Sequence, residues 1–103
     1  MTSARSGAWI AKHVREAPAE LRSQVLRDTE AITEAEPLPE ALAEAGWSVL
    51  GRALARPSDR SVALDLLTAD ALITLALLAQ AEERPEHLGR FAERLVAVHS
   101  AQA

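Results

Sequence analysis

The chain contains no cysteine and few aromatic residues: its 103 residues include two Trp, one Phe and no Tyr. Without cysteine it can form neither disulfide bonds nor thiolate metal sites, and the redox compartment is left open. Aromatic residues make up 3% of the chain and hydrophobic residues 49%, so the core must consist mainly of Leu, Ala and Val. Alanine buries little area, so such a core is thin, and association with a partner would be a natural remedy.

Sequence signals for β-strands are missing as well. The chain has neither alternating runs of β-branched or aromatic residues nor Asn-Gly or Asp-Gly turns. It therefore predicts an all-α fold, a small bundle of four main helices preceded by a short N-terminal helix. Because a chain of this length commonly forms one domain and no linker or repeat interrupts it, we expect a single helical domain over residues 1–103.

The chain also lacks an excess of positive charge. Its net charge of -4 argues against a nucleic-acid partner, because nucleic-acid-binding proteins generally need a basic face. The N-terminal residues contain no apolar run long enough for a secretory signal, so we expect a cytoplasmic protein. One Lys beside ten Arg, together with abundant Ala, is typical of a GC-rich bacterial genome.

The most informative segment that is present covers residues 62–79, with the sequence VALDLLTADALITLALLA. On a helical wheel its apolar residues point in nearly every direction, whereas a surface helix keeps a single apolar stripe. A helix that is apolar all round must be enclosed on most sides. The sequence therefore predicts a central, near-fully apolar helix over about residues 59–83.

The same segment is near the lower length limit for a membrane span. Asp65 and Asp70 fall inside it, and each costs on the order of 2.5–3.5 kcal/mol on the insertion scale. Each large aliphatic residue returns about 0.3–0.6 kcal/mol, so all of them together return about 3–5 kcal/mol against about 5–7 for the two acids. The sequence therefore predicts a buried helix in a soluble protein and no membrane span.

Prolines divide the rest of the chain. A short first helix is predicted to end before Pro18, and Pro18 is expected in the first turn of the next helix. The alternative is a single helix that is kinked at Ala17. Two prolines so close together in residues 34–39 predict a loop, and Pro57 ends the helix that follows it. After the short N-terminal helix, the predicted helices cover about residues 18–33, 39–56, 59–83 and 85–100.

Recognisable catalytic patterns are missing from the sequence. It has no Gly-x-Ser-x-Gly motif, no Gly-rich phosphate loop and no Glu-x-x-His pair of the di-iron bundles. A two-histidine metal site formed by His13 and His99 is one interpretation; semi-buried or interface histidines are the other and the one that we favour. We therefore expect no catalytic residues, no metal and no cofactor.

The polar residues of the central helix are the candidates for a ligand pocket. Asp70 and Thr74 are one turn apart and share a face, while Asp65 points roughly the opposite way. A buried carboxylate is costly unless it is paired. The candidate partners are three arginines spaced four residues apart, namely Arg52, Arg56 and Arg60. One interpretation is an internal pocket near Asp70 and Thr74; the other is that both acids are structural, each placed near a helix end or an arginine.

Trp47 is the candidate interface residue. It lies at the edge of the apolar stripe of its helix, where a large aromatic side chain is often an interface anchor. The equally weighted alternative is that it shields a thin core. Gly46 and Gly51 lie in the same helix, and we expect them to permit a close crossing with a neighbouring helix.

These observations favour a protein that acts by association, as a homodimer or as an accessory subunit of a larger complex. The alternative is a helical small-molecule-binding domain with an internal pocket near Asp70 and Thr74. An enzyme comes third, because no group of residues supports one.

Overall fold

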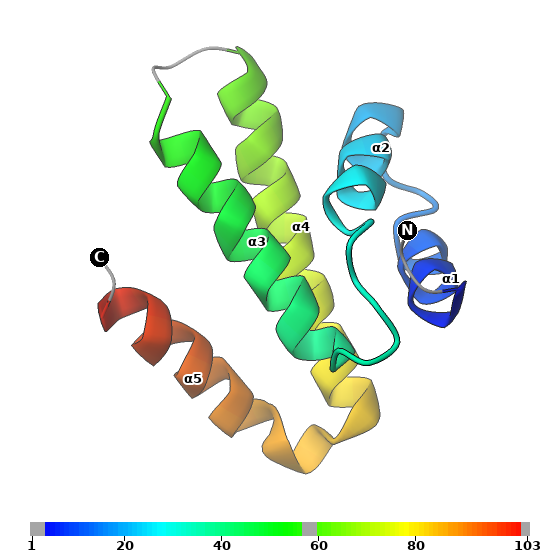
Figure 1. Cartoon of the computed structure of the whole chain (residues 1–103), viewed down its shortest axis with the longest axis vertical. Helices are drawn as coiled ribbons and strands as arrows, with labels where there is room; N and C mark the ends of the chain where they lie inside the picture. The colour runs from blue at the N-terminus through cyan, green and yellow to red at the C-terminus, as the bar shows by residue number, and fades with distance from the viewer. Residues whose placement is uncertain (1–3, 57–59, 102–103) are drawn as a thin grey trace.

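The computed structural model describes residues 4–56 and 60–101, and throughout these two ranges the regular structure is helical (Figure 1). The elements are α1 (Ala4–His13), α2 (Ala19–Asp28), α3 (Leu38–Leu54), α4 (Arg60–Glu83), the short 3₁₀-helix η1 (Pro85–His87) and α5 (Leu88–Ala101). The predicted all-α bundle with a short leading helix is therefore confirmed.

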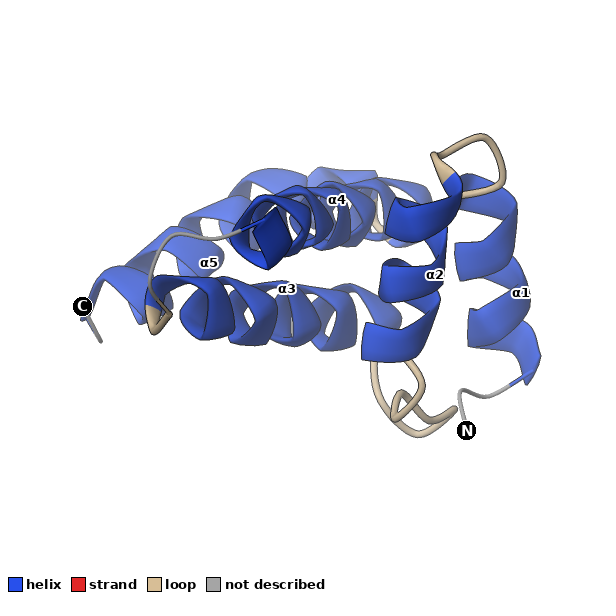
Figure 2. Cartoon of the chain, turned by 90° about the horizontal axis from the view of Figure 1, so that it is seen from above, coloured by secondary structure: helices blue, strands red, loops and turns tan. Residues whose placement is uncertain are grey.

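The centre of the molecule is the antiparallel pair of α3 and α4, which pack along each other's length (Figure 1). The short helices α1 and α2 lie on one side of this pair, and α5 lies on the other (Figure 2). α5 turns back at the end of α4 and then diverges from α3 toward its own C-terminal end. The radius of gyration, 13.4 Å, is that of a compact domain of this length.

Within the described residues the boundaries follow the prolines with one exception. Pro18 directly precedes α2 and Pro39 lies in the first turn of α3, whereas Pro57, predicted to end that helix, lies outside the described residues. A turn over residues 14–17 separates α1 from α2, so the single kinked helix is wrong. The exception is α2, which ends at Asp28 rather than near Thr33. The next residue, Thr29, has a buried hydroxyl that donates a 2.9 Å hydrogen bond to the Val25 carbonyl in the last turn of the helix. Ile32 is buried as predicted, from the loop that follows rather than from the helix.

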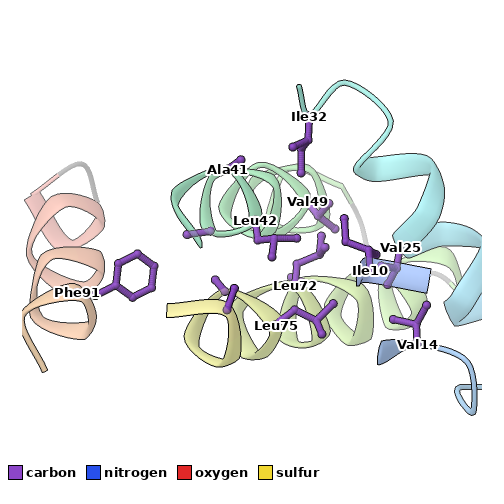
Figure 3. Packing of buried hydrophobic residues seen from close by; sticks show 14 residues of the cluster. Ile10, Val14, Val25, Ile32, Ala41, Leu42, Val49, Leu72, Leu75 and Phe91 are labelled. Carbon is purple, nitrogen blue, oxygen red and sulfur yellow. The ribbon is translucent and has the colours of Figure 1, made fainter. Parts of the chain in front are cut away.

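The core is aliphatic, as the composition predicts. Ile10 of α1 and Val25 of α2 meet the α3–α4 pair on one side, and Phe91 packs on the other side from α5 (Figure 3). The largest fully buried hydrophobic side chains are Phe91, Ile10, Leu42, Leu72, Val25 and Val49. The few large apolar side chains of the core are thus divided between the two sides of the α3–α4 pair.

α4 is the central helix, but it is enclosed on only part of its circumference. Leu72 and Leu75 are buried, whereas Leu66, Leu67 and Leu78 are exposed at 45%, 56% and 38%. The prediction of enclosure on most sides is therefore wrong, because the remaining helices are too few and too short to cover a 24-residue helix. By length and composition α4 also passes the test for a membrane span, as the core helix of a soluble protein can.

Candidate association surfaces

Asp65 lies in a charged cluster where α2, α3 and α4 meet. Its side chain is 8% exposed and accepts hydrogen bonds from Arg52, at 3.1 Å, and from Arg56. Arg52 also holds Asp28 of α2 at 3.2 Å, and its bonds to Asp28 and Asp65 raise the pKa of the Arg52 guanidinium. Two of the three predicted arginine partners are therefore confirmed for Asp65. The cluster holds α2 on the α3–α4 pair, which is a structural role.

Asp70 and Thr74 lie on the opposite side of α4, and both side chains are exposed. They therefore line no cavity inside the chain, and the fold does not form the internal pocket that was expected near them. The physical reason is the same as for the exposed leucines: no other helix of the chain covers this side of α4.

The exposed side of α4 is mostly apolar along its whole length. Its exposed members are Ala63, Leu66, Leu67, Asp70, Thr74 and Leu78, with Leu77 and Ala81 partly buried beside them. We call this set the open face of α4. Figure 2 shows α4 as one layer of the molecule and α3 as the layer beneath it. Helical spacing places the open face on the side of α4 opposite the buried Leu72. An uncovered apolar surface agrees with the association expected for a thin core, but the sequence alone does not say which side of α4 stays uncovered.

Trp47 is half-buried on α3. Helical spacing places Leu50 and Leu54 on the same side of α3 as Trp47, and Leu54 is 75% exposed. We call these three residues the α3 edge. This edge is a second, smaller apolar surface, and it lies on a different helix from the open face.

A cleft of about 550 Å³ separates α1, the loop over residues 34–38 and the C-terminal end of α4. Its polar groups contact one another across the cleft. The Trp9 indole N–H donates to Glu82 Oε1 at 3.1 Å, and His13 Nε2 lies 3.5 Å from Glu82 Oε2. The backbone N–H of Arg5 donates to Glu34 at 3.3 Å. These contacts attach α1 to α4 and to the loop.

The histidines form no metal centre in the part of the chain that the structure describes. Nowhere within residues 4–56 and 60–101 do three or more His, Cys, Asp or Glu side chains gather as they would around a metal ion. His13 bonds the Trp9 carbonyl through Nδ1 at 2.8 Å and stacks on the Trp9 ring. The His99 side chain lies outside the described residues, so the two-histidine interpretation stays open.

No protein-family model, curated protein or solved structure matches this chain.

Proposed function

We propose that this chain functions by association with another protein chain, as a homodimer or as an accessory subunit of a larger complex, in the cytoplasm of a bacterium. The observation that supports the proposal is the open face of α4, where Leu66, Leu67 and Leu78 stand uncovered on the longest helix. Soluble proteins rarely leave contiguous apolar surface in water unless it contacts something. We favour the homodimer, because two-fold pairs are the commonest assemblies of soluble chains.

The α3 edge is the second candidate contact surface, with Trp47 as its anchor. A Trp that keeps part of its ring at the surface offers a large apolar area at a low entropy cost, and Trp is enriched among the residues that dominate binding energy. Leu54, exposed at 75%, extends the same surface. This edge is available to a different protein subunit when the open face of α4 is occupied.

Sedimentation equilibrium of the full chain, from below one micromolar to several hundred micromolar, tests the proposal. We expect the weight-average mass to rise with concentration from that of one chain, 11.1 kDa, toward twice that value. Circular dichroism at both ends of the range should show the same helix content, because the helices form within each chain. A strict monomer at the highest concentration would contradict the homodimer.

A further inference from the structure

The open face of α4 has the spacing of a coiled-coil seam. Steps of four and three residues alternate along it through Ala63, Leu67, Asp70, Thr74, Leu77 and Ala81. This is the a/d spacing of the heptad repeat, with which one helix packs along another. The remaining heptad positions include Leu72 and Leu75, which are buried in the chain's own core. α4 therefore presents one face to its own bundle and a complete seam to the outside.

The residues of the seam are arranged symmetrically about position 72. Ala63 and Ala81 are equally far from Leu72 along the helix, and so are Leu67 and Leu77. Asp70 and Thr74 flank Leu72 in the same way, and the exposed neighbours Leu66 and Leu78 are symmetric about it too. A two-fold interface requires such self-complementarity, because residue i contacts residue j of the other copy while j contacts i.

We propose that the occupant of the open face is a second copy of this chain, whose α4 packs antiparallel to the first about a two-fold axis beside Leu72. Alanine then faces alanine at the ends of the seam, leucine faces leucine inside them, and Asp70 faces Thr74 at the centre. This inference rests on the proposed function and adds the partner, the orientation and the register.

The central polar pair selects the antiparallel orientation. In that orientation the Thr74 hydroxyl of one copy can donate a hydrogen bond to the Asp70 carboxylate of the other, and the two-fold axis makes the contact twice. A parallel pair in the same register would place Asp70 against Asp70, where two like charges repel each other. A polar residue in an otherwise apolar seam commonly fixes register and orientation in this manner, at some cost in stability.

Cross-linking through introduced cysteines tests this register. Because the chain has no native cysteine, only the introduced residues can form a disulfide bond. Two full-length variants are prepared, Ala63→Cys and Ala81→Cys, and each is oxidised alone and in an equal mixture. In the proposed dimer, position 63 of one copy lies opposite position 81 of the other, within reach of a disulfide. Two copies of position 63 lie about 27 Å apart along the helix axis, well beyond that reach.

We expect the mixture to form a disulfide-linked dimer on denaturing gels and each variant alone to remain monomeric there. Cross-linking of Ala63→Cys alone as efficiently as the mixture would overturn the antiparallel register. A mixture that does not cross-link, at a concentration where the wild-type chain sediments as a dimer, would overturn this inference and leave the proposed function standing. A wild-type chain that stays monomeric at several hundred micromolar would overturn both.

A second pair of variants separates the seam from exposed leucines in general. Leu67→Glu places a charge in the seam, whereas Leu26→Glu places one at an exposed leucine of α2, outside it. We expect Leu67→Glu to raise the dimer dissociation constant at least about tenfold and Leu26→Glu to change it by less than about twofold. Circular dichroism shows that both variants fold. Equal effects of the two variants would contradict the seam.

Discussion

The side chain of Ile73 on α4 lies over Gly46 on α3, so that a Cβ placed on Gly46 would be 2.9 Å from Ile73 Cδ1 and 3.3 Å from Leu72 Cβ. α3 can approach α4 here because Gly46 has no side chain. The close crossing expected for Gly46 is therefore confirmed. For Gly51 the expectation is wrong, because a Cβ added there would meet nothing within 4 Å.

This difference predicts opposite effects for one substitution at two positions in the same helix. Gly46→Ala should lower the free energy of unfolding by about 1–2 kcal/mol, since Ile73 must move, although alanine favours the helix. Gly51→Ala should raise it by about 0.5–1 kcal/mol, because only the backbone preference changes. Urea denaturation of the two variants at one protein concentration measures both changes. A rise in the free energy of unfolding for Gly46→Ala would mean that α3 and α4 are not in close contact at Gly46.

Leu72→Ala and Leu75→Ala should each lower the free energy of unfolding by about 2–5 kcal/mol, because both side chains are buried in the core. A loss of this size can unfold so small a domain, so thermal denaturation followed by circular dichroism is the suitable measurement. Leu67→Ala, at an exposed position of the same helix, is the matched control and should change the monomer by less than about 1 kcal/mol. Losses below about 1 kcal/mol at both buried sites would show that α4 is not packed there.

Asp65→Asn should lower the free energy of unfolding by about 1–3 kcal/mol, because it removes the negative charge that accepts hydrogen bonds from Arg52 and Arg56. The effect stays below that of a fully buried pair, since both arginine side chains are more than one third exposed. Glu44→Gln, at an exposed position of α3, is the control and should change stability by less than about 0.5 kcal/mol. Identical urea midpoints for the two variants would remove the structural role given to the cluster.

Trp47→Ala tells the two candidate surfaces apart. Trp47 lies on α3, outside the seam of α4, so the antiparallel pairing predicts that self-association changes by less than about twofold while helicity is kept. If Trp47 instead anchors the homodimer, self-association should weaken by more than about 1–2 kcal/mol. Sedimentation equilibrium of the variant beside the wild-type chain measures the difference, and the larger loss would move the homodimer contact to the α3 edge.

Local features of the fold could be predicted from the sequence because each depends on neighbouring residues. Pro18 directly precedes α2 and Pro39 lies in the first turn of α3, and the spacing of Arg52 and Arg56 identifies the partners of Asp65. The end of α2 at Asp28 could not be predicted in this way, because no proline or glycine follows it before Thr33.

The coverage of α4 could not be predicted in the same way. A helical wheel gives the direction of each side chain, but it does not say how many neighbouring helices are available to cover it. Asp70 and Thr74 were recognised as a pair on one face, yet whether that face is inside or outside depends on where α5 and α2 end.

The two tryptophans give the molecule independent optical reporters. Trp9 joins α1 to the end of α4 through its bond to Glu82, so its emission should change when the N-terminal helix detaches. Trp47 stands on α3 with part of its ring at the surface, so its emission should respond when something covers that helix. Variants that keep one tryptophan at a time can therefore follow the attachment of α1 and the occupancy of the α3 edge separately, in real time and without an added dye.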